Sequence, residues 1–125
     1  MPSKLTVWYN TKCPVCDAGI KRQKHRLIEV IRSGDIEFRD INFEPEALAG
    51  FGASLEDIRR RLHAVDASRR LYVGADCARE IWLRTPGERW IGRLAGLPIV
   101  RSAVRAGYNG FADLLYRWNR RQGRW

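Results

Sequence analysis

Apolar and polar side chains alternate from Lys4 to Tyr9, and this pattern predicts a first β-strand. From Pro14 to about Arg32 the apolar positions recur at spacings of three and four, which predicts one amphipathic helix that ends at Ser33 and Gly34. The segment from Ile36 to Ile41 is rich in β-forming residues and follows that glycine, so it predicts a second strand. Together these segments indicate a β-α-β unit.

The next segment predicts a loop and a short helix. Residues Asn42 to Ala53 lack a sustained period, and Pro45 favours one helical turn just after it. Ser54 then precedes an apolar pattern at helical spacing, with Asp57 three residues later. This spacing is typical of a capping box, so we expect a short helix that begins at Ser54.

The last part of the chain predicts a hairpin followed by helices. Leu62 to Val65 and Leu71 to Val73 are short apolar runs separated by a polar turn, which indicates two antiparallel strands. A helix is expected to begin at Ala75 or Asp76 and to end before Pro86, and a short basic helix follows around Trp90 to Leu94. Pro98 is expected to open a final helix with an apolar stripe, which we interpret as a packing face: Val104, Tyr108, Phe111, Leu115 and Trp118.

This order of elements is that of an α/β, thioredoxin-like domain: β-α-β, helix, β-hairpin, helix, with a helical C-terminal extension. No repeat and no long linker divides the sequence. We therefore expect residues 1–125 to form a single thioredoxin-like domain, with residues 86–125 as a basic helical extension packed on it.

Two cysteines lie where the first strand leads into the first helix: Cys13 directly precedes the helix, and Cys16 lies in its first turn. Their spacing at a helix start brings the two sulfurs within reach of a disulfide. Unpaired N–H groups, the helix dipole and the adjacent Lys12 all favour a thiolate at Cys13. Pro14 suits the first helical position because its φ angle is already helical. Cys16, one turn into the helix, is expected to be more buried and less ionised, and it is the natural resolving thiol.

The cysteine pair has alternative interpretations. A zinc site would have to recruit Cys77 and either His25 or His63, and no second close pair of ligands accompanies them. A pair without redox activity is the other alternative. His63 lies near the hairpin entry, where it would act as a proton donor or positive neighbour to the thiolate, or else be an ordinary packed residue. For Cys77 we favour a small buried hydrophobe over a third redox thiol.

Composition limits the classes of protein to consider. With 125 residues, of which 45% are hydrophobic, the chain can bury one core. Three cysteines do not make a secreted disulfide framework, so we expect a reducing, cytoplasmic setting. The start of the chain lacks the pattern of a signal peptide, and charges interrupt the apolar stretch from Leu94 to Leu115, so no membrane span is expected.

The formal net charge of +9 is concentrated in the last part of the chain, where residues 79–125 hold ten arginines and three acidic residues. Such an excess favours nonspecific attraction to nucleic acid or to anionic membranes and can also select acidic partners, but the interpretation that we favour is a solvated basic face of an Arg-rich helix. No nucleic-acid-binding motif accompanies the charge, and nucleic acid is not the expected partner. The alternative to a redox function is therefore a basic interaction module that binds an acidic protein or nucleic acid through its Arg-rich C-terminal region.

Several motifs together resemble one known family. These are the strand followed by residues 9–16, the hairpin of residues 62–76, the Leu97-Pro98 dipeptide and the helix from Tyr108 to Arg120. In these features the chain is similar to the DCC family of thiol-disulfide oxidoreductases, named for an Asp-x-x-Cys-x-x-Cys motif. The resemblance implies a thioredoxin-like fold and disulfide exchange, with Cys13 and Cys16 as the redox pair.

The chain departs from the family pattern at several positions. Asn10 stands where the motif has Asp, and Thr11 stands where Gly is usual. Cys77 occupies a position that is usually small and apolar, and no proline precedes the hairpin.

The expected partners are a disulfide-bearing protein or a small thiol, together with a dithiol electron donor. We expect no bound cofactor or metal, and a monomer.

Overall fold

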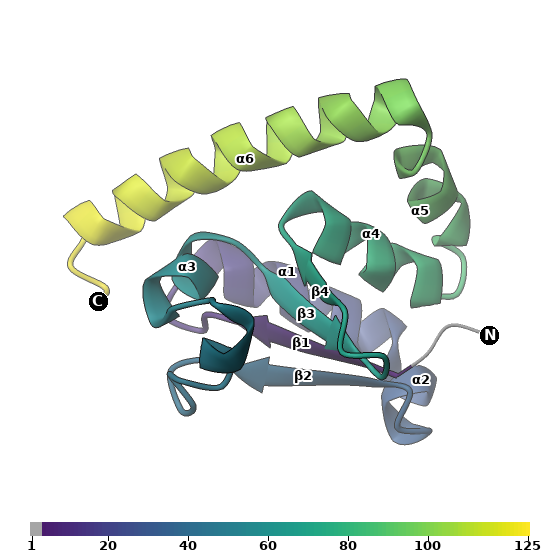
Figure 1. The fold of residues 1–125 in the computed structure, drawn as a ribbon, viewed down its shortest axis with the longest axis horizontal. Helices are drawn as coiled ribbons and strands as arrows, with labels where there is room; N and C mark the ends of the chain where they lie inside the picture. The colour runs from purple at the N-terminus through teal and green to yellow at the C-terminus, as the bar shows by residue number, and fades with distance from the viewer. Residues whose placement is uncertain (1–3) are drawn as a thin grey trace.

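A mixed sheet in the strand order β2-β1-β3-β4 lies at the centre of the computed structural model, which describes residues 4–125 (Figure 1). Strand β1 pairs in parallel with β2 and antiparallel with β3, which forms a hairpin with β4. The elements in chain order are β1 (Leu5–Tyr9), α1 (Pro14–Arg26), α2 (Ile28–Arg32), β2 (Ile36–Asp40), the short 3₁₀ helix η1 (Ala49–Phe51), α3 (Leu55–Arg60), β3 (His63–Asp66), β4 (Leu71–Val73), α4 (Ala75–Arg84), α5 (Arg89–Ala95) and α6 (Pro98–Arg121).

The two faces of the sheet bury different clusters because successive side chains of β1 point to opposite sides. Leu5 and Val7 pack on one face in a cluster with Leu27, which lies between α1 and α2, with Ala64 of β3, and with Cys77 and Ile81 of α4. Trp8 points to the other face and packs with Ile58 of α3 and with the loop that precedes it. Both faces of β1 are therefore covered, and its carboxyl end leads directly to Cys13.

The structure confirms the mixed α/β, thioredoxin-like architecture and its C-terminal helix. The β-α-β unit, the hairpin and the capping box of Ser54 and Asp57 lie where the sequence predicts them. Two predictions of detail are wrong. The single helix expected from Pro14 to Arg32 is broken at the fully buried Leu27, and the helical turn expected just after Pro45 is the 3₁₀ turn at Ala49–Phe51.

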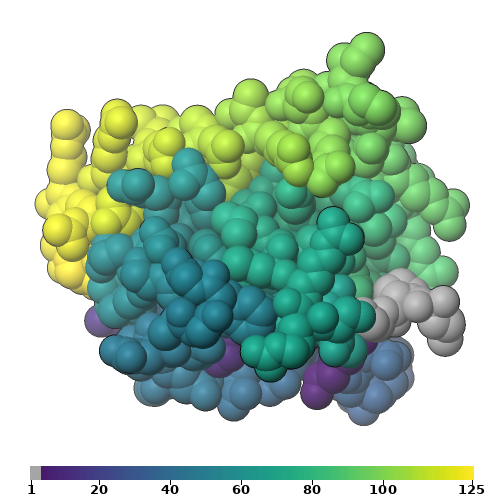
Figure 2. All heavy atoms as spheres, viewed as in Figure 1, coloured from purple at the N-terminus to yellow at the C-terminus, as the bar shows by residue number. Residues whose placement is uncertain are grey.

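The long helix α6 crosses over α4 and ends near α3, on the side of the molecule where α1 begins (Figure 1). Several polar contacts hold it along its length, and three of them are spread from its first half to its second. The hydroxyl of Tyr108 accepts a hydrogen bond of 3.0 Å from the backbone N–H of Leu62, Arg105 pairs with Asp76 at 2.7 Å, and the Tyr116 hydroxyl donates to Glu56. Figure 2 shows α6 as a continuous band along one side of the molecule.

The apolar stripe predicted on the last helix is only partly a packing face. Phe111 and Trp118 are exposed, and Ala112 and Asn119 are the residues of α6 that are buried. Within residues 4–125, no helix has both the length and the apolar character that crossing a membrane requires.

We predict that Tyr108→Phe lowers the free energy of unfolding by about 1–2 kcal/mol, because the Leu62 N–H then loses its acceptor at a partly buried position. Urea denaturation followed by circular dichroism measures this loss. Tyr116→Phe is the matched control, since it removes an exposed hydrogen bond and should cost less. Equal losses for the two variants would contradict this role of Tyr108.

Candidate active site

The sulfur of Cys13 takes the place of a helix-capping oxygen at the start of α1. Cys13 is the N-cap residue, with extended backbone angles (φ −90°, ψ 111°), and its Sγ accepts a hydrogen bond of 3.3 Å from the backbone N–H of Cys16. Pro14 occupies the first turn, as the sequence predicts. The sulfur thus satisfies one of the N–H groups that a helix start leaves unpaired, and a negative charge on it is favoured there.

The two cysteines have opposite acid strengths. The side chain of Cys16 donates a hydrogen bond that, together with the Cys16 backbone N–H and the side chain of Asn119, lowers the pKa of Cys13 to about 6 in spite of burial. The same side-chain hydrogen bond to Cys13, followed by burial, raises the pKa of Cys16 far above its ordinary value. At neutral pH the pair therefore holds one thiolate, at Cys13, and one thiol, at Cys16. Both residues are free cysteines in this structure.

The relative burial of the two cysteines is the reverse of what the sequence predicts. Cys13 is only 1% exposed, whereas Cys16 is partly exposed. By exposed area, the expectation that Cys16 is the more buried residue is therefore wrong, whereas the expectation that it is less ionised agrees with its raised pKa. Part of the reason is tertiary, because Asn119 of α6 forms a hydrogen bond with Cys13 at the start of α1.

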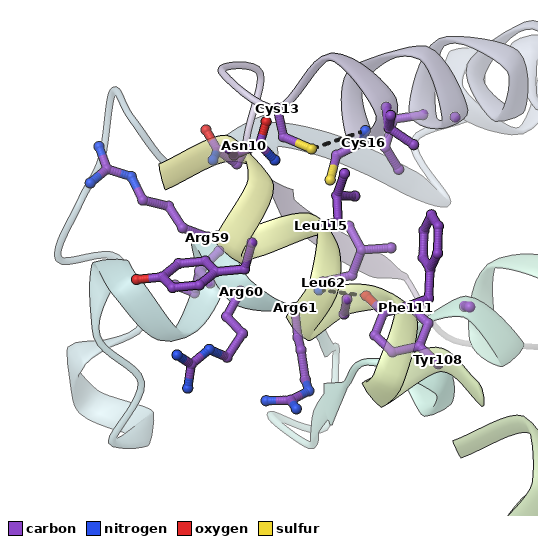
Figure 3. Close-up of a pocket in the computed structure, with 18 of the residues that line it drawn as sticks. Asn10, Cys13, Cys16, Arg59, Arg60, Arg61, Leu62, Tyr108, Phe111 and Leu115 are labelled. Atoms are coloured by element: carbon purple, nitrogen blue, oxygen red, sulfur yellow. Dashed lines mark hydrogen bonds between the residues drawn. The ribbon is translucent and has the colours of Figure 1, made fainter. Parts of the chain in front are cut away.

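Both sulfurs nevertheless face a cavity of about 380 Å³ between the start of α1 and α6. Its walls are largely apolar: Val15, Ile20, Leu62, Ile81, Trp82, Tyr108, Phe111, Ala112 and Leu115 line it. Two of these residues are exposed, Val15 at 44% and Phe111 at 58%, so the cavity opens to solvent between α1 and the middle of α6. In Figure 3, α6 passes beside the cysteine pair, and Tyr108, Phe111 and Leu115 extend from it.

A polar network fixes the loop that leads from β1 to Cys13. The side-chain oxygen of Asn10 accepts from the backbone N–H of Lys12 at 3.0 Å and from the amide of Asn42 at 2.7 Å. The hydroxyl of Thr11 donates to Asp40 at the end of β2, and Asp40 also accepts from the Asn42 amide at 2.8 Å. Asn10 and Thr11, where the chain departs from the family pattern, thus tie the cysteine loop to the neighbouring strand.

Asn119 is a site residue that sequence reasoning missed. It is 1% exposed and lowers the pKa of Cys13 through a hydrogen bond, while Arg124 donates to its side-chain oxygen at 3.2 Å. The sequence did carry a signal: positions 108, 112, 115 and 119 share one face of a helix, and Asn119 is the one amide among them. The predicted stripe instead continued to Trp118, which is exposed.

The other predicted residues lie around the pair or apart from it. Lys12 is exposed, and it contributes the backbone N–H that binds Asn10. His63 pairs with Trp8 across the sheet, and its Nδ1 lies 2.9 Å from the carbonyl oxygen of Arg61. Burial lowers the pKa of His63, and the described residues that line the cavity do not include it. The structure therefore does not bring His63 to the cysteines.

Cys77 lies in the main core. It is fully buried against the sheet, and burial raises the pKa of its thiol far above the ordinary value. This placement matches the interpretation of Cys77 as a small buried hydrophobe. Within the described part of the chain, no group of three or more His, Cys, Asp or Glu side chains is arranged to hold a metal ion.

Comparison with known proteins assigns the chain to a family. The family model for DCC1-like thiol-disulfide oxidoreductases matches residues 7–121, which is nearly the whole chain. No curated protein and no solved structure shows significant similarity to it. The chain belongs to the DCC1-like thiol-disulfide oxidoreductase family, as the sequence resemblance implied.

We predict that alkylation of Cys13 by iodoacetamide follows an ionisation near pH 6. The rate should be high above this pH, where the thiolate is present, and should fall as the pH drops through it, because the protonated thiol does not attack. Rates measured from about pH 4 to pH 9, with mass spectrometry to locate the label, test this against an unperturbed thiol pKa of about 8.5.

A pair of variants tests the cause of this low pKa. Cys16→Ser keeps a hydroxyl that can donate to the Cys13 sulfur, whereas Cys16→Ala keeps only the backbone N–H. We expect the alanine variant to shift the alkylation profile to higher pH than the serine variant does. Coincident profiles for the two variants would exclude the side-chain hydrogen bond as the main cause.

Proposed function

We propose that this member of the DCC1-like thiol-disulfide oxidoreductase family exchanges disulfides through Cys13 as the attacking thiolate and Cys16 as the resolving thiol. The observation that carries the proposal is the separation of the two pKa values across one helical turn. A nucleophile must be ionised at the working pH, whereas a resolving thiol should stay protonated until the mixed disulfide has formed.

The reaction proceeds in two exchanges. In the first, the Cys13 thiolate attacks one sulfur of the substrate disulfide, the substrate S–S bond breaks, and the second substrate sulfur leaves as a thiolate. In the second, Cys16 loses its proton and attacks the Cys13 sulfur, which releases the other half of the substrate. Two electrons pass from the protein dithiol to the substrate, and the products are a Cys13–Cys16 disulfide and two substrate thiols.

The surroundings of the pair support each step. While Cys13 is a thiolate, the Cys16 thiol donates to it and its own pKa is raised. Formation of the mixed disulfide removes the charge on Cys13 and with it this hydrogen bond, so the pKa of Cys16 falls when its attack is needed. Asn119 and the Cys16 N–H act as fixed donors to the sulfur.

We propose a disulfide-bearing protein or a small disulfide as the substrate, and a dithiol protein or small thiol as the electron donor that regenerates the pair. The basic interaction module has less support, because several arginines of the C-terminal region are engaged within the chain. Arg101 and Arg105 pair with Asp76, and Arg124 lies over the ring of Trp118.

We also propose that residues 1–125 act as one domain, with residues 86–125 as an integral part of it. Support comes from the position of α6, whose residues contact α3, α4 and α5 and line the cavity beside the cysteines. On this proposal the helical extension is one wall of the active site.

We predict that Cys13→Ser abolishes reduction of a model disulfide, because no thiolate remains to begin the exchange. Cys16→Ser should retain the first exchange and accumulate a mixed disulfide at Cys13, because no thiol remains to resolve it. Thiol release followed with a chromogenic reagent, and intact-protein mass spectrometry, measure these outcomes. Cys77→Ala is the control and should retain turnover, since Cys77 lies in the core. Turnover that survives in Cys13→Ser would refute the proposal.

A further inference from the structure

We infer that the cavity beside the cysteines binds a small organic disulfide that carries a carboxylate or carbonyl oxygen near its sulfur, and that the side-chain amide of Asn10 recognises this oxygen. The inference rests on the proposed function and names its substrate class. It starts from an unpaired donor in the wall of the cavity.

Asn10 lines the cavity beside Cys13 and is 2% exposed, and its side-chain Nδ2 is buried without a hydrogen-bond partner (Figure 3). The orientation of this amide is fixed, because its oxygen already accepts from two N–H donors, on Lys12 and Asn42. Reversing the amide would place its NH₂ group against both donors. The unpartnered group beside the cavity is therefore a donor, buried just behind the cavity surface, and buried donors in folded proteins nearly always have an acceptor.

A second unpaired donor lies on the same wall. Arg59 lines the cavity and donates from Nη2 to the oxygen of Asn42 at 3.1 Å, while its Nε is buried without a partner. Arg59 and Asn10 are thus joined through Asn42, and each has one side-chain nitrogen without a hydrogen-bond partner. Both unused groups are satisfied by oxygens that accept hydrogen bonds, which carboxylates and carbonyls provide.

The remainder of the cavity sets the size and character of the ligand. Most of the remaining wall is apolar, from side chains of α1, α4 and α6, although further donors also line it: Arg22, Gln23, Arg60, Arg61 and Asn119. A volume of about 380 Å³ suits a small molecule, since small-molecule pockets are typically about 300–1,000 Å³. The chemistry of the walls fits a compact disulfide with an apolar body and an oxygen acceptor at one end.

The covering of Cys13 favours a small disulfide over a protein disulfide. Cys13 is 1% exposed and faces the cavity, so a substrate sulfur must enter the cavity to reach it. Helix α6, which forms the opposite wall, is held by the contacts of Tyr108 with Leu62, of Arg61 with Asp113 at 3.0 Å and of Arg105 with Asp76. A wall fixed at these points leaves little room for the flanking chain of a folded protein.

The experiment compares two disulfides of similar length in each protein. Dithiodipropionate presents carboxylate acceptors, whereas cystamine presents ammonium donors. Their leaving thiols differ in pKa, and this difference cancels when the ratio of their rates is compared between a variant and the unmodified protein. Asn10→Asp keeps the oxygen that binds Lys12 and Asn42 but turns the unpartnered group beside the cavity from a donor into an acceptor. We expect it to lower the ratio of kcat/KM for dithiodipropionate over cystamine by about tenfold or more, because a carboxylate then meets a carboxylate.

The ratio isolates recognition from thiol reactivity, since any change in the Cys13 nucleophile affects both disulfides alike. Asn109→Asp is the matched control, because it introduces the same charge at an exposed position of α6 where the side-chain oxygen already accepts from Arg61. Its ratio should change little, as exposed charges are screened. An unchanged ratio in Asn10→Asp, or faster reduction of insulin than of dithiodipropionate by the unmodified protein, would overturn the inference.

A binding measurement separates this inference from the proposed function. Dithiodipropionate is titrated by calorimetry into the Cys13→Ser, Cys16→Ser protein, with and without Asn10→Asp. Binding that Asn10→Asp weakens supports the inference even if the unmodified protein turns over no disulfide, which would refute the proposed function alone. Absence of binding, or binding that Asn10→Asp leaves unchanged, overturns the inference.

Discussion

The hydrogen bond from the Cys16 backbone N–H to the Cys13 sulfur is the contact on which the rest of the site depends. It places a sulfur where helix starts usually carry an oxygen, and so it joins the end of β1, the first turn of α1 and the reactive group in one arrangement. The same geometry brings the Cys16 side chain to Cys13, which makes one thiol acidic at the expense of the other. The low pKa of Cys13 and the closeness of the two cysteine side chains therefore have the same structural cause.

Helix α6 forms the opposite wall of the cavity into which the cysteine pair at the start of α1 faces. It supplies Asn119 to the sulfur and four largely apolar side chains to this wall, and its contacts with Leu62, Asp76 and Glu56 hold it beside the pair. The cost is a nucleophile with little exposed surface. Access then runs through the cavity, which makes the shape and polarity of its walls the basis for selecting a substrate.

Local patterns were sufficient to predict the elements that begin and end at short sequence signals. The Cys-Pro-x-Cys start of α1, the capping box at Ser54 and the hairpin after Leu62 each depend on residues within a few positions of one another. The break at Leu27 could not be predicted, because the apolar period continues through it and the burial of Leu27 decides where the helix ends. The covering of Cys13 was also beyond sequence reasoning, since it depends on Asn119, far along the chain.

The most direct test of the account is to oxidise the reduced protein in a graded thiol–disulfide buffer and to map its disulfides by mass spectrometry. The account predicts a reversible disulfide between Cys13 and Cys16 with the loss of two hydrogens, while Cys77 stays reduced in the core. A protein in which this disulfide never forms, or in which Cys77 is the cysteine that oxidises, would contradict it.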